Sequence, residues 1–234
     1  MLYDVENLHA AYPPGGEVAS WTTSLPASAQ TRSKAWTLPQ LALKRGLDVA
    51  ASLFLLIAFA PLLIAIGIAV RVIDGASVLY SQERYGRHGN RFRILKFRTM
   101  RVDEPGSRFV QVSRNDPRVT RLGAFLRRTS LDELPQLINV LLGDMSLVGP
   151  RPHAIAMEEQ NFRLYPRAAL RLAMRPGMTG LAQIRGLRGP TATRNQMRER
   201  LSADVEYVED WTLWRDIRIL MHTPGAWILG KNAH

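Results

Sequence analysis

The sequence predicts an α/β (mixed α+β) domain that carries one apolar, proline-bent helix toward its N-terminal side. The first observation is the run Val49–Val70, in which Ser52 is the one polar residue. The second is a pair of short β-type runs at residues 78–80 and 92–94, with glycines between them. The third is a series of helix-starting signals and helically spaced apolar residues from residue 116 onward.

The composition predicts a basic protein that binds anionic partners. The 234 residues suffice for one large domain or two small ones. The net charge is +11, from 31 Lys and Arg against 20 Asp and Glu, which favours nucleic acid, anionic lipid or phosphorylated substrates. The chain has no cysteine, which excludes disulfides and cysteine metal sites. Residues 1–40 are rich in Pro, Gly, Ser, Thr and Ala without periodicity, and we expect a flexible tail there.

The apolar run Val49–Val70 predicts a helix that enters a membrane. A helix of about 22 residues is about 33 Å long, enough to cross a bilayer. The alternative is a buried core helix, although a soluble helix seldom stays apolar on every side. Pro61 lies within the run, where it removes a backbone hydrogen bond and bends the helix.

Both flanks of this run are basic, which argues against a simple crossing. Lys44 and Arg45 precede the run, and five arginines follow it: Arg71, Arg84, Arg87, Arg91 and Arg93. Because basic flanks stay in the cytoplasm, neither end is expected to leave it. We therefore predict a re-entrant helix within residues 41–75, kinked at Pro61. Asp48, at the edge of the run, is expected to pair with Arg45 or with a backbone donor.

Two short strands come next and carry a basic pair. Gly86 and Gly89 predict a turn between residues 78–80 and 92–94. Lys96 and Arg98 are two residues apart, so in a strand they share one face. They form either a solvated charged face or a binding site for a diphosphate.

An amphipathic helix is predicted over residues 116–128. Asp116 followed by Pro117 is a helix-starting signal, with the aspartate at the N-cap. Arginines surround its apolar side: Arg118, Arg121, Arg127 and Arg128. This pattern is typical of a helix in the membrane interface and equally of a helix packed on a soluble core.

An adjacent pair of acids, Asp132 and Glu133, stands before Pro135. Proline favours the first turn of a helix because it lacks a backbone N–H. The acids would then sit at the positive end of a short helix, where negative charge is stabilised. The alternative is an ordinary capping box formed by Ser130 and Glu133, which would place the proline inside the helix.

The residues after the acid pair add a third acid and a fixed cation. Gly143 is expected to end the short helix in a left-handed cap, and Asp144 follows it. Arg151 lies between Pro150 and Pro152, so its backbone has little freedom to lose on binding a phosphate.

The C-terminal part predicts further helices around a turn-rich loop. Tyr165 followed by Pro166 starts a helix that ends near residue 174, and residues 175–183 form the loop. Residues 191–229 predict two or three helical pieces, whose tryptophans suit either the core or a membrane boundary. The sequence contains no Walker phosphate loop and no Gly-x-Gly-x-x-Gly after a strand, so a Rossmann-type nucleotide site is not expected.

Four motifs, in this order, resemble those of the bacterial sugar transferases, which are monotopic polyprenyl-phosphate phosphoglycosyl transferases. The motifs are Lys44–Asp48, Lys96–Met100, Ser130–Pro152 and Arg175–Gln183. The resemblance covers roughly residues 41–234, and the C-terminal end is most similar to the members that initiate exopolysaccharide synthesis.

The resemblance implies a location and a reaction. It implies that residues 76–234 form a cytosolic, membrane-associated catalytic domain with interfacial amphipathic helices, at the cytoplasmic face of the bacterial inner membrane. A sugar-1-phosphate would pass from a UDP-sugar, expected to be UDP-glucose or UDP-galactose, to undecaprenyl phosphate with release of UMP. The family's nucleophile corresponds to Asp132, which would form a covalent phosphosugar intermediate, as carboxylates can. Glu133 would assist it.

The resemblance also assigns three sets of residues. Substrate or phosphate binding falls to Lys96, Arg98, Arg151, Arg175 and Gln183. Binding of Mg2+, which offsets the charge of a diphosphate, falls to Asp132, Glu133 and Asp144. The membrane helix contains Lys44, Arg45, Asp48 and Pro61. Whether Arg185 or Arg188 contacts the nucleotide stays open, and so does a homodimer.

A second class of function is a membrane-tethered basic protein that binds its partners without catalysis. Charge alone favours it. It does not explain why three acids and a proline-fixed arginine gather within a basic chain. A protein of this class would bind nucleic acid or lipid, whereas the resemblance to the transferases implies a UDP-sugar, undecaprenyl phosphate and membrane lipid as partners, with no nucleic acid. Release of UMP from a UDP-sugar and undecaprenyl phosphate distinguishes the two classes.

Overall fold

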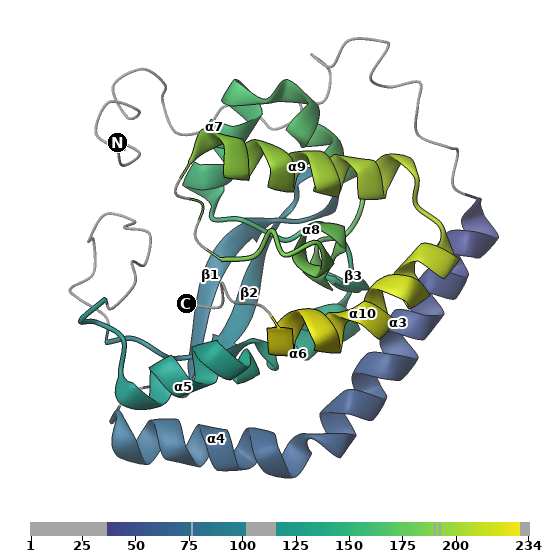
Figure 1. The fold of residues 1–234 in the computed structure, drawn as a ribbon. Coiled ribbons are helices and arrows are strands. Elements are labelled where there is room, and N and C mark those ends of the chain that lie inside the picture. Colours follow the sequence, from purple (N-terminus) through teal and green to yellow (C-terminus); the bar gives the residue numbers. More distant parts are fainter. Residues whose placement is uncertain (1–36, 76, 102–115, 190, 192, 230–234) are drawn as a thin grey trace.

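The computed structural model describes residues 37–75, 77–101, 116–189, 191 and 193–229, and Figure 1 shows their arrangement. Helices surround two small sheets, which confirms the prediction of a mixed α+β fold. Most of the predicted tail, up to residue 36, lies outside the described residues. The first described helix begins at Leu38, slightly before the predicted boundary at residue 41.

In chain order, a bent helix pair leads into a β-hairpin, and helices with short strands between them follow. The elements are α3 Leu38–Ala58, α4 Ala60–Ile73, β1 Leu79–Tyr85, η1 Arg87–Gly89, β2 Arg91–Phe97, α5 Arg121–Thr129, η2 Leu131–Glu133, α6 Gln136–Leu142, β3 Ser146–Val148, α7 Ile155–Leu164, η3 Pro166–Ala173, β4 Gly177–Thr179, α8 Leu181–Ile184, α9 Arg194–Glu209 and α10 Leu213–Leu229, where η marks a 3-10 helix.

The helices α3 and α4 form a bent pair along the edge of the molecule (Figure 1). They meet at Phe59 with a bend of 62°. Pro61 lies in the first turn of α4, so the predicted bend is confirmed. In the described part of the chain, no single helix has both the length and the hydropathy to cross a membrane; the two helices taken together do.

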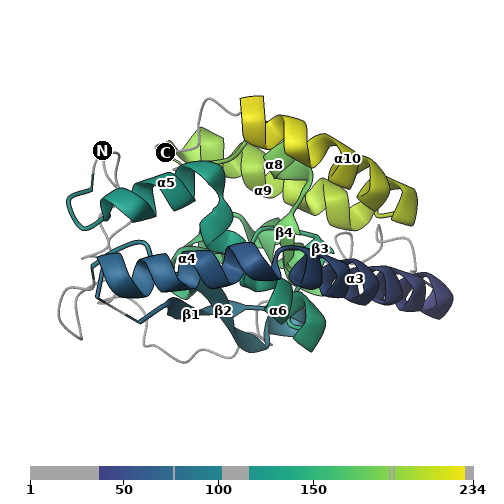
Figure 2. The same cartoon turned by 90° about the horizontal axis from the view of Figure 1, so that it is seen from below.

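The outer surface of this pair is apolar. Its exposed large apolar side chains are Leu38, Leu43, Leu47, Leu53, Phe54, Ile57, Phe59, Leu62, Ile64, Ile68, Val72 and Ile73. On the other side of α4, Ile66 and Val70 pack against Phe97 of β2 and Leu126 of α5. Figure 2, seen from below, shows α4 running beside α5. Insertion of the outer surface into a membrane stays a prediction.

Lys44 attaches α3 to the C-terminal helices through a buried ion pair. Its Nζ lies 2.6 Å from Asp216 Oδ2 of α10 and donates to Val148 O at 3.0 Å. Asp216 also accepts from Tyr207 OH at 2.7 Å and from Trp211 Nε1 at 3.1 Å. Every charge of this buried group therefore has a close polar partner, as buried charges require.

Arg45 and Asp48 attach α3 to α6 and β3. Arg45 donates to the carbonyl oxygens of Val140 and Leu141, at the C-terminal end of α6. Asp48 Oδ1 accepts the N–H of Leu147 at 3.0 Å. Of the two partners predicted for Asp48, the backbone donor is the one found.

The antiparallel hairpin of β1 and β2 confirms the two predicted strands and extends both. Tyr80 pairs with Lys96 and Tyr85 with Arg91, and the turn η1 contains Gly89. The second sheet pairs β3 and β4 in parallel, where the sequence predicted a loop instead of β4.

The parallel pair depends on glycine. A Cβ on Gly177 would lie 2.1 Å from the backbone nitrogen of Gly149, and a Cβ on Gly149 would lie 2.4 Å from Arg175 O. Gly149 N donates to Thr179 O and Gly177 N donates to Pro150 O, both at 2.9 Å. These contacts bring the Pro-Arg-Pro segment against the second turn-rich segment and so fix the backbone that leads into Arg151.

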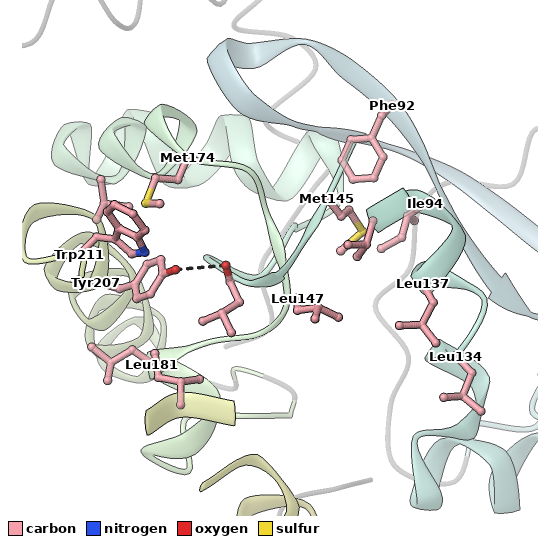
Figure 3. Close-up of a cluster of buried hydrophobic side chains, with 14 residues drawn as sticks. Phe92, Ile94, Leu134, Leu137, Met145, Leu147, Met174, Leu181, Tyr207 and Trp211 are labelled. Carbon is pink, nitrogen blue, oxygen red and sulfur yellow. Dashed lines mark hydrogen bonds between the residues drawn. The ribbon is translucent and has the colours of Figure 1, made fainter. Parts of the chain in front are cut away.

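The main hydrophobic core lies between the hairpin, α6 and α9 (Figure 3). Its labelled members include Phe92, Ile94, Leu134, Leu137, Met145, Leu147, Met174, Leu181, Tyr207 and Trp211. Trp211 is therefore a core residue, whereas Trp214 is 62% exposed. The predicted helical pieces of the C-terminal part are confirmed as α9 and α10, and the helix after Pro166 is of the 3-10 type.

The predicted helix start at Asp116 is wrong. The helix α5 begins at Arg121 with Thr120 as its N-cap, and Thr120 Oγ1 accepts the N–H of Gly123 at 2.9 Å. Asp116 Oδ1 instead accepts the N–H of Arg118 at 3.0 Å, in a turn that precedes the helix. Aspartate before proline favours both turns and helix starts, so the local signal did not separate them.

The variant Lys44→Met should lower the free energy of unfolding by about 3–5 kcal/mol, because it leaves Asp216 buried without its cation. Arg185→Met is the control, since it breaks the exposed Arg185–Glu206 pair and should cost under about 1 kcal/mol. Urea unfolding of the full chain in detergent, followed by circular dichroism, measures both losses. Equal losses in the two variants would contradict the role of the buried pair.

Candidate active site

The acid pair lies in one 3-10 turn between two helices. Asp132 and Glu133 belong to η2, and each is only 7% exposed. Ser130, just before the turn, has a φ of 59°, a conformation that costs energy for a non-glycine residue. The Ser130 side chain makes no capping bond. The capping-box alternative is therefore wrong, and the later helix start, at Gln136, is confirmed.

Glu133 is held by two cations. Its Oε1 lies 2.8 Å from Lys96 Nζ, and its two oxygens accept from the two terminal nitrogens of Arg151 at 2.5 and 3.2 Å. Burial alone would raise the pKa of Glu133, but the charges and hydrogen bonds of Arg151 and Lys96 outweigh it and hold this pKa well below its usual range. Glu133 is therefore a fixed anion in the fold.

Asp132 has the opposite environment. Burial, and then the charge of Glu133, raise its pKa to about 6 against the opposing effect of Lys96, Arg127 and Arg151. Among the described residues we find no hydrogen bond or ion pair to its carboxylate. One acid of the pair is thus neutralised by protein cations, and the other keeps its oxygens available for a substrate.

Two further arginines approach the acid pair. Arg127 donates from Nε to Thr99 Oγ1 at 2.8 Å, and its charge acts on both acids. Arg188 donates to Ser130 Oγ, directly before the turn. Arg185 instead forms an exposed ion pair with Glu206. Of the two arginines left open by the sequence, Arg188 is therefore the one beside the acid pair.

Arg98 does not join Lys96 at the acid pair through any contact in the described residues. Its backbone N–H donates to Val78 O at 3.0 Å. Its side-chain Nε is buried without a hydrogen-bond partner. The predicted pairing of Lys96 and Arg98 as one phosphate site stays a prediction.

Two predicted site residues, Asp144 and Arg175, lie at the other end of α6 from the acid pair. The third, Gln183, lies in α8. Asp144 follows the Gly143 cap, whose φ of 95° confirms the predicted left-handed end. Arg175 Nε donates to Gly143 O at 2.7 Å, and Gln183 Nε2 donates to Met178 O at 3.0 Å. The acid pair precedes α6 and Asp144 follows it, so the structure does not bring the three predicted metal-binding acids together.

The carboxylate of Asp132 could bind Mg2+ if a substrate supplied phosphate oxygens as further ligands. In the described part of the chain, no group of three or more His, Asp or Glu side chains could hold a metal by itself. Mg2+ in phosphate-handling sites uses one or two carboxylates, with phosphate oxygens and water as the other ligands. The carboxylate of Asp132 fits this need, whereas both oxygens of Glu133 already accept from Lys96 and Arg151.

A buried polar network contacts the backbone of Arg151 and fixes its position. Arg171 donates to the backbone oxygen of Arg151 and forms ion pairs with Glu158 and with Asp204, the latter at 3.0 Å. His153 Nδ1 lies 2.7 Å from Glu158 Oε2. The position of Arg151 is therefore set by buried side chains as well as by its two prolines.

A pocket of about 160 Å³ opens beside the acid pair. Its lining residues are Arg84, Ile94, Lys96, Gln136, Arg151, Pro152, His153, Ala154 and Met157. The sequence did not mark Arg127, Gln136 or His153 as site residues, and it gave Arg84 only as a basic flank. The proximity of Arg127 and Gln136 to the acid pair in the chain was the available signal; nothing local pointed to Arg84 or His153.

The buried carboxylate of Asp132 has no partner in the part of the chain that the structure describes, and the charges of Lys96, Arg127 and Arg151 act on it. This arrangement defines a candidate enzyme site for phosphorylated substrates. The family described as bacterial sugar transferase matches residues 39–230. A UDP-glucose:undecaprenyl-phosphate glucose-1-phosphate transferase of Caulobacter vibrioides is 48% identical over 200 residues, which are 84% of this chain and 75% of that protein.

Two other relatives have descriptions that are consistent with this family. A protein with the same description from Escherichia coli is 45% identical over 192 residues, which are 82% of this chain but only 41% of that protein. The exopolysaccharide production protein PSS of Rhizobium leguminosarum is 46% identical over 187 residues, which are 78% of this chain and 94% of that protein. The chain belongs to the bacterial sugar transferase family and is a transferase, as its motifs predicted.

The variant Asp132→Asn should raise the free energy of unfolding at about pH 7.5, by up to about 3 kcal/mol. The fold raises the pKa of Asp132 from 3.8 to about 6, so the folded state holds this proton more tightly than the unfolded state. Stability is therefore lost as the pH rises from about 4 to about 6. Asparagine removes that loss, and its benefit should vanish below about pH 4.

Glu133→Gln is the matched contrast to this variant. It should destabilise the protein, because Lys96 and Arg151 lose the anion between them. Thermal unfolding across this pH range measures both variants. A loss of stability in Asp132→Asn at neutral pH would contradict the argument from burial.

Proposed function

We propose that this chain transfers a sugar-1-phosphate from a UDP-sugar to undecaprenyl phosphate and releases UMP. The observation that carries the proposal is the contrast between the adjacent acids: Asp132 is unpartnered among the described residues, and Glu133 is held by Lys96 and Arg151. The names of the Caulobacter and Escherichia relatives support UDP-glucose as the donor, and UDP-galactose is the second candidate. The product would start an exopolysaccharide or another glycan, a role that the name of the Rhizobium relative supports.

In this mechanism Asp132 is the nucleophile. A carboxylate oxygen forms a bond to the phosphorus next to the sugar, and the bond from that phosphorus to the bridging oxygen breaks. UMP leaves with the bridging oxygen and its electron pair. An oxygen of undecaprenyl phosphate then attacks the same phosphorus and frees the carboxylate, which splits one difficult substitution into two.

The environment of Asp132 supports this role. A pKa of about 6 leaves its carboxylate mostly ionised at neutral pH, and no hydrogen bond from the described residues has to break before it attacks. Lys96 and Arg151 stand beside it as fixed cations that stabilise charge as it shifts between phosphate oxygens. Bound Mg2+ would supply further neutralisation of the diphosphate, with Asp132 as its protein ligand.

We also propose that α3 and α4 form a re-entrant element in the cytoplasmic face of the inner membrane. Lys44 of α3 pairs with Asp216, and Asp74, at the end of α4, accepts from Thr120 Oγ1 at 3.0 Å. Both limbs of the bent pair are therefore attached to the same folded domain. Since a crossing helix would place its ends on opposite sides of a bilayer about 30 Å thick, these contacts favour entry and exit on one side.

The covalent intermediate is tested by intact-protein mass spectrometry with a UDP-sugar and no lipid acceptor. The unmodified protein should gain the mass of one sugar-phosphate, and peptide mapping should place it on Asp132. Asp132→Asn should gain none, because it lacks the attacking oxygen, whereas Glu133→Gln should still form some adduct, slowly.

The rival mechanism is direct attack by the lipid phosphate, with both acids only holding Mg2+. It predicts no adduct and equal failure of the two variants, with partial rescue by added metal. An adduct on Glu133 would also overturn the assignment. If no UMP is released with both substrates present, the chain would instead act as a membrane-tethered binding protein without catalysis.

The membrane topology is tested by single cysteines, for which this chain offers a cysteine-free background. Ser24→Cys, in the N-terminal segment, and Ser81→Cys, after the bent pair, should both resist a membrane-impermeant thiol reagent in intact cells. Both should react once the cells are opened, which is the control. Labelling of Ser24→Cys alone in intact cells would mean that the helix pair crosses the membrane.

A further inference from the structure

The pocket beside the acid pair presents buried polar atoms that the described protein leaves without partners. They are Nε and Nη1 of Arg84, Nε2 of Gln136 and Nε2 of His153, and all three residues line the pocket. Gln136 is 2% exposed and His153 is 7% exposed. A buried polar atom without a partner destabilises a fold, so four of them on three residues that line one pocket indicate a binding site for a polar ligand.

The hydrogen bonds of His153 Nδ1 determine whether the other ring nitrogen, Nε2, is a donor or an acceptor. Nδ1 lies 2.7 Å from Glu158 Oε2, closer than it lies to Arg171 Nη1 at 3.3 Å or to Asn161 Nδ2 at 3.4 Å. Burial would raise the pKa of Glu158, but the charge of Arg171 and the hydrogen bonds from His153 and Arg171 lower it to about 2. An ionised carboxylate only accepts, so Nδ1 carries the proton. Burial, and then the charge of Arg171, lower the pKa of His153 to about 4, so the ring is neutral. Its Nε2, buried without a partner in the described residues, is therefore an acceptor.

The pocket thus combines donors with an acceptor. Arg84 and Gln136 can only donate from their free nitrogens, and His153 accepts. A phosphate dianion offers only acceptors and would meet the lone pair of His153 Nε2 unfavourably. The imide edge of uracil carries one N–H between two carbonyl groups, which complements the set. Ile94 and Met157 supply apolar lining for a planar ring.

We propose that this pocket binds the uracil base of the UDP-sugar. Arg84 and Gln136 donate to the carbonyl oxygens of the base, and His153 Nε2 accepts its N3–H. The proposal rests on the proposed function, which supplies the UDP-sugar. Lys96 and Arg151 line the same pocket and also hold Glu133, so cations stand between the base site and the acid pair, where the diphosphate belongs.

The ligand series on the unmodified full chain tests the proposal first. Calorimetric titration in detergent compares UMP with CMP, N3-methyl-UMP and glucose-1-phosphate. UMP should bind about tenfold more tightly than CMP or N3-methyl-UMP, because cytosine has no N–H at N3 and the methyl group blocks it. Equal affinities for these three nucleotides would overturn the proposal.

Pocket variants test the residues. Gln136→Leu and Arg84→Met should each weaken UMP binding about tenfold and leave glucose-1-phosphate binding unchanged. Arg93→Gln is the control, since it removes an exposed arginine from β2 outside this pocket and should not change UMP binding. Loss of glucose-1-phosphate binding alone in the pocket variants would place the sugar there and overturn the proposal. If a variant does not fold, the nucleotide series on the unmodified chain still decides.

Turnover is measured separately, so the two proposals can fail independently. Base selectivity in binding without any release of UMP from UDP-sugars would support the uracil site and contradict the proposed function. Release of UMP with no selectivity between UMP, CMP and N3-methyl-UMP in binding would support the function and contradict the uracil site.

Discussion

The ion cluster around Glu133 is the interaction on which the rest of the site depends. It joins three segments that are distant in the chain: Lys96 from β2, the turn that carries the acids, and Arg151 from the loop after β3. Once Glu133 is fixed in this way, the backbone of Asp132 is fixed as well, although its side chain is left without partners in the described residues. Desolvation then raises the pKa of Asp132, and no hydrogen bond from the described residues restrains its oxygens.

A buried polar network supports this cluster at some cost in stability. Arg171 lies between Glu158 and Asp204 and donates to the backbone of Arg151. Burying such charges yields little net stability, because the desolvation cost offsets the attraction between them. Burial raises the pKa of Asp204 to about 6 in spite of Arg171, which is consistent with that cost. The gain is in geometry, since Arg151 cannot turn away from Glu133 without leaving buried groups unpaired.

Local signals in the sequence were sufficient to predict features that depend on the backbone conformation of a single turn. Pro61 predicted the bend and Gly143 predicted the left-handed helix end, because each acts through its own φ angle or missing N–H. Signals that depend on long-range packing failed or stayed open. Asp144 is close to the acid pair in the chain, but α6 separates them in space, and the choice of Arg188 over Arg185 required the position of Ser130. Asp116 gave a wrong prediction of a helix start, because aspartate caps turns and helix N-termini through the same hydrogen bonds.

The short helix α6 links the bent helix pair to the acid pair. Arg45 of α3 donates to carbonyl groups at the C-terminal end of α6, and the acids lie in the turn before its N-terminal end. Seven residues of helix span about 10 Å and cannot stretch, because each turn is held by backbone hydrogen bonds. Under the proposed function, the lipid phosphate stays at the membrane surface and Asp132 must reach it. The length of α6, together with its attachment to Arg45, would then set how far Asp132 lies from the part of α3 that carries Arg45.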